Sequence, residues 1–318
     1  MAATCPWCNA PRDSGPECPK CGANYAKAEA IKKQGRAGAA ASVPVAAPVE
    51  EAPALPGGIQ LAPLTEPEGI QDPALEFKFC LAAIPAMLVL GVLFNAFMPF
   101  LQRTFLTMPV HELGHSITAW LCGFWSIPTL WKAITAETRG FVTPLVVLGA
   151  VGFMAWRAWA KENWLVVALA GMILLLQLVG TLGIKEKTAM MLVVFGGDGL
   201  GMILATLLMA SFYFGKETNL YKGSLRWGFV AIGAAAFVDM FSVWWATRTD
   251  KGRIPFGEQE GTGLSDATKL VDDYGWTVDQ LVSRHVTVGV LCLLALAAVY
   301  AWGAWRAWQA AQDAHPRV

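Results

Sequence analysis

Long apolar stretches separated by short polar segments occupy most of the chain after residue 76. Seven of them are long enough, or nearly so, to cross a bilayer as helices, at 77–99, 106–126, 140–160, 163–184, 188–214, 223–246 and 285–305. The stretch at 106–126 is the least hydrophobic because it carries two histidines and a glutamate. The pattern predicts an all-α polytopic bundle of six or seven transmembrane helices within residues 77–310, with a polar loop at 247–284.

Composition supports a membrane location. Only 15% of the 318 residues are charged and 55% are hydrophobic, whereas soluble domains carry about 25% charged residues. The formal net charge is zero, which gives no electrostatic basis for nucleic-acid binding. The lipid bilayer is therefore the predicted environment of the chain.

Residues 1–26 contain two Cys-x-x-Cys pairs, Cys5 with Cys8 and Cys18 with Cys21. Four thiolates at this spacing suit the closed tetrahedral shell of a structural zinc ion, and so short a segment needs a metal in order to fold. Two disulfides, or an iron site with the same ligands, are the alternatives. The segment resembles the short zinc ribbons of many bacterial proteins, which implies a module for a protein partner. Metal-binding thiolates stay reduced in the cytoplasm, so the N-terminus is predicted to be cytoplasmic.

Residues 27–76 are rich in alanine and proline and have no helical apolar stripe. They are predicted to form a disordered linker between the zinc ribbon and the membrane domain.

His111-Glu112-Leu113-Gly114-His115 is the motif that indicates chemistry. On a helix, the two histidines lie on one face and can bind one zinc ion, and Glu112 can take a proton from a zinc-bound water. Ionisable side chains inside membrane segments are costly and usually functional. The alternatives are chance occurrence or two histidines that are merely hydrogen-bonded on a helix, and the placing of two of the four histidines beside a glutamate disfavours both.

HELGHSITAWLCG resembles the first conserved segment of site-2 proteases, which are intramembrane zinc metalloproteases. In that family HExGH is followed by a small residue four positions later and a glycine four beyond that, matched here by Ala119 and Gly123. The resemblance implies that His111 and His115 bind a catalytic zinc and that Glu112 is the catalytic base. The third ligand in the family is an aspartate followed by glycine in a later span, and Asp198 in FGGDG matches that pattern.

The Asp198 segment differs from the family because no Asn- and Pro-containing stretch precedes it, and Asp239 is the rival ligand. Two remaining polar positions have simpler interpretations. Asn95 is expected to form an interhelical hydrogen bond, and His285, at the start of the last span, is expected to be solvated.

The predicted function is therefore hydrolysis of peptide bonds in a membrane-anchored protein or peptide, by a multi-pass protein of a bacterial cell membrane with two zinc ions, one catalytic and one structural. The rival hypothesis is a non-catalytic membrane scaffold that recruits a partner through its ribbon. The glutamate of the HELGH motif favours the enzyme, since a structural zinc site needs no base.

Overall fold

The computed structural model describes residues 72–214, 225–259 and 263–314, together with Pro11, Gly15, Cys18 and Tyr25. The chain divides into two units, Met1–Pro63 and Leu64–Val318, and every helix and strand discussed here belongs to the second unit. Of the four predicted ribbon cysteines, Cys18 is described and is buried, whereas Cys5, Cys8 and Cys21 lie outside the described residues. The zinc ribbon and the linker therefore stay predictions.

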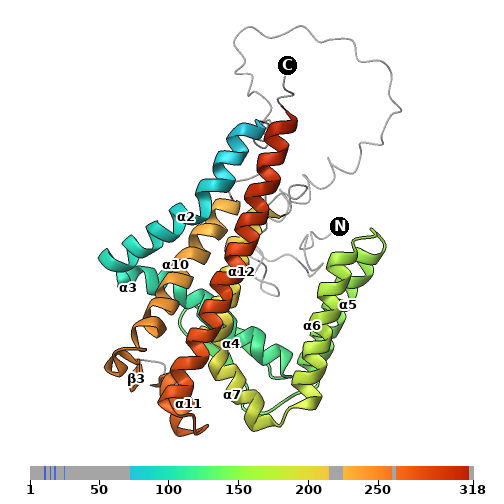
Figure 1. The fold of residues 1–318 in the computed structure, drawn as a ribbon. Helices are drawn as coiled ribbons and strands as arrows, with labels where there is room; N and C mark the ends of the chain where they lie inside the picture. The colour runs from blue at the N-terminus through green and yellow to red at the C-terminus, as the bar shows by residue number, and fades with distance from the viewer. Residues whose placement is uncertain are drawn as a thin grey trace. The chain divides into compact units, whose positions relative to one another are not determined.

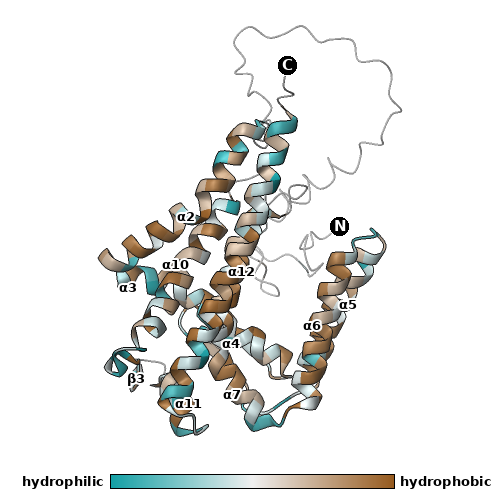
Figure 2. Ribbon diagram, in the orientation of Figure 1, coloured by the Kyte–Doolittle hydropathy of each residue, from teal (hydrophilic) through white to brown (hydrophobic). Residues whose placement is uncertain are grey.

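Five helices in the described residues are long and apolar enough to cross a membrane, as expected of a multi-pass membrane protein. Figure 1 shows them as extended rods, and Figure 2 shows hydrophobic colour along most of their length. They are α2 (Pro73–Phe97), α5 (Val142–Trp159), α6 (Trp164–Leu178, continued by the π-helical turn η2, Val179–Gly183), α10 (Leu225–Ala246) and α12 (Val278–Asp313).

A sixth crossing is formed if two shorter helices are counted as one span. Helices α7 (Glu186–Gly196) and α8 (Asp198–Ala210) meet at Gly197, and the pair is bent by 51° there. Five or six spans in the described residues compare with the six or seven predicted. The difference lies at 106–126, which forms a helix of only 14 residues followed by a strand.

The remaining elements are short and lie between the spans. After α2 come α3 (Pro99–Gln102), the π-helical η1 (Arg103–Thr107) and α4 (Met108–Leu121). Strands β1 (Ser126–Pro128) and β2 (Ala133–Thr135) pair antiparallel, and the 3-10 turn η3 (Ser211–Tyr213) ends α8. The predicted polar loop contains η4 (Lys251–Arg253), the antiparallel strands β3 (Glu258–Gln259) and β4 (Gly263–Leu264), and α11 (Asp266–Asp272).

The main apolar core lies among α2, α8, α10 and α12, which pack side by side. Its fully buried members include Met202, Met209, Val230 and Leu281. A bidentate ion pair also joins two of these helices, since both terminal nitrogens of Arg226 in α10 donate to the carboxylate of Glu76 in α2, at 2.9 and 3.0 Å. A buried charge is tolerated only when it is paired in this way, so the contact fixes α2 against α10.

Helices α5 and α6 form a hairpin that packs mainly on α4 (Figure 1). Arg139, just before α5, donates to the carbonyls of Gly180 and Thr181 in η2, both at 2.9 Å, and so joins the two ends of the hairpin. The hairpin leaves most of its apolar side chains exposed, as lipid-facing helices do.

Candidate metal centre

Helix α4 presents the two motif histidines on one face. His111 and His115 are one helical turn apart, and their Nε2 atoms are 3.1 Å from each other. Both residues are buried, at 9% and 8% exposure. The helical geometry predicted from the four-residue spacing is confirmed.

Glycines bring α4 into backbone contact with the bend between α7 and α8. A Cβ added to Gly114 would lie 2.4 Å from the carbonyl oxygen of Gly196, and one added to Gly197 would lie 2.5 Å from both imidazole rings. No larger residue fits at these approaches without displacement. The glycines around residue 197 thus permit both the bend between α7 and α8 and the close approach of two backbones.

Hydrogen bonds at the two Nδ1 atoms orient both rings. The Nδ1 of His115 donates to the carbonyl oxygen of Val193 at 2.7 Å, and the Nδ1 of His111 lies 2.8 Å from Oδ1 of Asp198. A carbonyl and a carboxylate accept here, so each Nδ1 carries a proton, and each Nε2 is the nitrogen that can bind a metal through its lone pair. Two such lone pairs facing each other at 3.1 Å are the arrangement that a metal ion uses.

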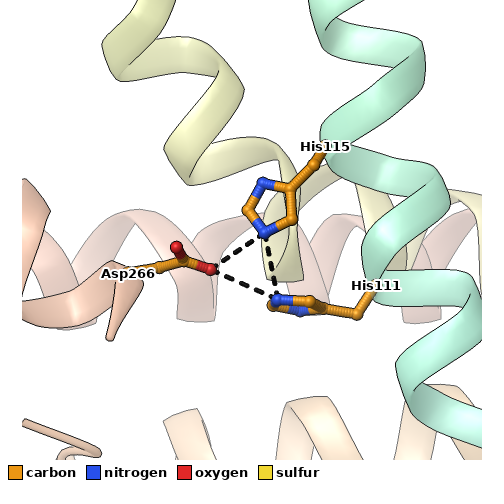
Figure 3. Close-up of side chains that lie close together, drawn as sticks. All are labelled: His111, His115 and Asp266. Atoms are coloured by element: carbon orange, nitrogen blue, oxygen red, sulfur yellow. Dashed lines mark hydrogen bonds and ion pairs between the residues drawn. The ribbon is translucent and has the colours of Figure 1, made fainter. Parts of the chain in front are cut away.

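Asp266 completes a triangle of donor atoms (Figure 3). Its Oδ2 lies 3.2 Å from Nε2 of His111 and 3.0 Å from Nε2 of His115. The corners of a tetrahedral shell with zinc–ligand bonds of about 2.0–2.1 Å are roughly 3.3–3.4 Å apart. The three atoms are therefore arranged with nearly the edge lengths of one face of such a shell, and they could hold a metal ion.

Asp266 is held in place by the start of α11. Ser265 caps this helix by accepting from the backbone N–H of Thr268 at 3.2 Å, which leaves Asp266 as the first helical residue. Burial alone would raise the pKa of the Asp266 carboxyl. The charge of His115 and hydrogen bonds from both histidines outweigh burial and hold that pKa well below its usual value. The carboxylate is therefore ionised, as a metal ligand must be.

Asp198, the predicted third ligand, lies next to the same histidine pair but on a different nitrogen. Its Oδ1 accepts from Nδ1 of His111, and its Oδ2 accepts from the indole Nε1 of Trp244 at 2.7 Å. The structure thus brings Asp198 to His111 and places Asp266, rather than Asp198, beside both Nε2 atoms.

Asp239, the rival ligand, belongs to a separate polar cluster. Its carboxylate accepts from Nη1 of Arg103 at 3.1 Å and from Nδ2 of Asn95 at 3.2 Å. The interhelical hydrogen bond predicted for Asn95 is confirmed. His285, predicted to be solvated, is instead 2% exposed, because its ring stacks on Trp244 with centroids 3.8 Å apart.

Glu112 follows His111 and is buried, with 4% exposure. Its Oε2 accepts a hydrogen bond from the backbone N–H of Ala133, the first residue of β2. The bond joins α4 to the β1–β2 hairpin, and Glu112 lines the same cavity as His111 and His115.

A cavity of about 590 Å³ opens at these residues, between the β1–β2 hairpin, α7 and α11. This volume is within the range of sites that bind organic ligands. Its lining combines the candidate catalytic residues with apolar and charged side chains: His111, Glu112, His115, Trp131, Lys132, Glu137, Met190, Val193, Leu264, Asp266, Lys269, Asp273 and Tyr274.

Sequence reasoning missed Asp266 because the polar segment around it offers several equivalent acids. The signal available was the Ser265 cap ahead of a short amphipathic run, which predicts a helix beginning at Asp266. Only the packing of α11 on α7 selects this aspartate over Asp272, Asp273 or Asp279.

Comparisons of the chain with protein-family models, with curated protein sequences and with solved structures found no match. The functional interpretation therefore depends on the geometry of the site and on the motif itself.

Proposed function

We propose that the protein is a membrane-embedded zinc metallopeptidase. The observation that carries the proposal is the triangle of His111 Nε2, His115 Nε2 and Asp266 Oδ2, with edges of 3.0–3.2 Å, next to the buried carboxylate of Glu112. Three protein ligands with an open fourth position are typical of catalytic zinc, whereas structural zinc has a closed shell.

The donor set fits zinc better than the other common divalent ions. Two imidazole nitrogens and one carboxylate oxygen are ligands of catalytic zinc, whereas magnesium and calcium prefer oxygen ligands alone. Both imidazoles already have Nδ1 donating to an oxygen, so neither ring needs to change tautomer to bind a metal through Nε2.

Each residue has one role in the proposed reaction. When bound, zinc would supply Lewis acidity, which polarises the scissile carbonyl and acidifies a water molecule. Glu112 accepts the proton of the attacking water and then delivers it to the amine that leaves. The hydrogen bond from Ala133 restrains the Glu112 carboxylate before substrate arrives. The peptide C–N bond breaks, and the water oxygen becomes part of the new carboxylate.

The lining of the cavity supports a peptide as the substrate. The cavity is bordered by apolar side chains such as Trp131, Met190 and Leu264 and by charged ones such as Lys132 and Asp273. A chain lying across it would meet both kinds of surface. The spans around the site favour a substrate that reaches it as an unwound part of a membrane-anchored protein, as the resemblance to site-2 proteases implies.

A non-catalytic membrane scaffold is the alternative. A large distance between Asp198 and the two histidines would favour the scaffold. In the structure, Oδ1 of Asp198 lies 2.8 Å from Nδ1 of His111. The scaffold also gives no role to Glu112, which is buried at the cavity instead of facing lipid. These observations support the peptidase.

The test compares wild-type protein, Glu112→Gln and His111→Ala after purification in detergent. Zinc content and cleavage of a fluorogenic membrane-segment peptide are measured for each. We expect His111→Ala to lose one zinc ion per chain relative to wild type, and Glu112→Gln to keep it while cleavage falls at least about 100-fold. Undiminished cleavage by Glu112→Gln would refute the peptidase. Equal zinc content in wild type and His111→Ala would refute the metal centre.

A further inference from the structure

We infer that Asp198 and Trp244 are positioning residues, which fix the tautomer and the rotation of His111 so that its Nε2 faces the metal position. The inference rests on the proposed metal centre and assigns a role to two residues that do not form the donor triangle. Asp198 bridges the two side chains, since one carboxylate oxygen lies 2.8 Å from Nδ1 of His111 and the other lies 2.7 Å from Nε1 of Trp244.

The surroundings of Asp198 keep its carboxylate in that orientation. It is the first residue of α8, a 13-residue helix whose N-terminal dipole favours a negative charge. Its side chain is only 15% exposed, so little water competes for the two oxygens. Both donors are N–H groups, and each occupies a separate oxygen, which fixes the carboxylate at two points.

Trp244 in turn is anchored by α12. The indole is 2% exposed and stacks on the ring of His285, with an interplanar angle of 9°. The Nδ1 of His285 lies 2.8 Å from the carbonyl oxygen of Leu281, one turn earlier in the same helix. A continuous set of contacts therefore runs from α12 through Trp244 and Asp198 to the candidate ligand on α4.

The two histidines differ in what holds them, and this difference makes the inference testable. His115 is oriented by a backbone carbonyl, that of Val193, which no substitution removes. His111 is oriented by a side chain that can be changed. Partners of this kind commonly raise metal affinity by 10–100-fold by fixing the ligand and increasing its basicity.

Asparagine at position 198 creates a specific conflict. The amide has one acceptor oxygen, whereas His111 Nδ1–H and Trp244 Nε1–H both require one. One donor must then face the amide NH2 group. Changing Trp244 to phenylalanine in the same chain removes the competing donor and leaves the amide oxygen for His111.

The experiment measures zinc affinity by chelator competition and records the visible spectrum of the Co²⁺-substituted protein. The variants are Asp198→Asn, Trp244→Phe, the double variant and Trp245→Phe, a matched control whose indole is 48% exposed. Size-exclusion chromatography confirms that each variant is folded. Asp198→Asn is expected to bind zinc about 10–100-fold more weakly but to reach full occupancy at saturating zinc. Trp244→Phe is expected to show a smaller loss, and Trp245→Phe none.

The double variant gives the decisive result, because it is expected to bind zinc no more weakly than Asp198→Asn. Loss of the site at saturating zinc in Asp198→Asn would instead make Asp198 a ligand, and unchanged affinity would show that it does not act on His111. A double variant with the summed loss of both single changes would also overturn the inference. The proposed function is tested separately, in wild-type protein, where it fails if zinc or cleavage is missing. If wild-type protein binds zinc but cleaves no peptide, the peptidase is refuted and the positioning role of Asp198 still stands.

Discussion

Two groups of carboxylates in the same bundle, one buried and one partly exposed, are neutralised in different ways. Asp239 receives hydrogen bonds from Arg103 and Asn95, so its charge is balanced by the protein itself. Asp266 and Asp198 instead lie on either side of two histidines. In the described residues neither of these aspartates has an arginine among its hydrogen-bond partners.

This difference identifies where an ion belongs. A carboxylate that already has an arginine partner gains little from a metal ion, whereas the two aspartates beside the histidine pair have no hydrogen-bonded arginine in the described residues, and the Nζ of Lys269 lies 3.6 Å from Asp266. The amino-acid type alone does not distinguish Asp239 from Asp266. The partner of each carboxylate does.

The largest expected effect separates these two acids directly. Asp266→Asn removes one of three ligand atoms and should weaken zinc binding at this site by more than about 100-fold, beyond what loss of a positioning partner causes. Asp239→Asn should leave zinc content unchanged and cost about 1–3 kcal/mol of stability, because a charged hydrogen bond is weakened. Zinc analysis and thermal unfolding of both variants check this. The reverse pattern would transfer the third-ligand role to Asp239.

Removal of the metal should act on only one of the two clusters. Wild-type protein in the presence of a chelator is expected to be less stable by about 2.7 kcal/mol than the same protein with free zinc at 100 times the dissociation constant. The Asp239→Asn variant should lose as much, and His111→Ala should lose only what the N-terminal cysteines contribute. Thermal unfolding with and without chelator measures the difference, and an equal response in wild type and His111→Ala would contradict the assignment.

Gly197→Ala tests the glycine contact without changing a ligand. The added methyl group would lie 2.5 Å from both imidazole rings, and overpacking of this kind costs about 1–3 kcal/mol, which would lower zinc affinity by roughly 5–150-fold if the cost falls on the metal-bound state. Gly171→Ala is the matched control, since nothing lies within 4 Å of its added methyl group. Chelator competition measures the zinc affinity of both variants. Similar zinc affinities would show that the imidazole rings can move to accommodate the added methyl group.

The smallest effect should have the opposite sign. The Nζ of Lys269 lies 3.6 Å from Oδ1 of Asp266, where its charge competes with a bound cation. Because such partly exposed pairs contribute roughly 0.2–1 kcal/mol, Lys269→Met should tighten zinc binding by up to about fivefold. The same competition assay detects this change, with Lys251→Met as control, because Lys251 pairs with Asp279. Weaker zinc binding in Lys269→Met would mean that the lysine supports the site.

Local patterns were sufficient to predict the helix that carries the motif and most of the spans. The spacing of His111 and His115 specifies one helical face, and long apolar runs specify membrane helices whatever their neighbours are. The glycines around residue 197 are a local signal of the same kind, since glycine is unfavourable inside a helix and allows two backbones to approach. Each of these properties depends on residues adjacent in the chain.

Tertiary packing determined what the pattern could not provide. The pattern places Asp198 near the histidines, but which ring nitrogen it faces depends on how the helices pack. Asp266 depends on α11 packing against α7, and the burial of His285 depends on Trp244 from another helix. The β1–β2 hairpin was missed because three-residue strands carry almost no periodic signal.

The bent pair of α7 and α8 has a consequence for the sidedness of the protein. Counted as one pass, it gives six crossings, an even number, so Asp72 and Ala314 emerge on the same face of the membrane. The β1–β2 hairpin and α11, which border the cavity, follow odd-numbered crossings and lie on the opposite face. On this count the cavity and Asp72, the residue that caps the start of α2, lie on opposite faces of the membrane.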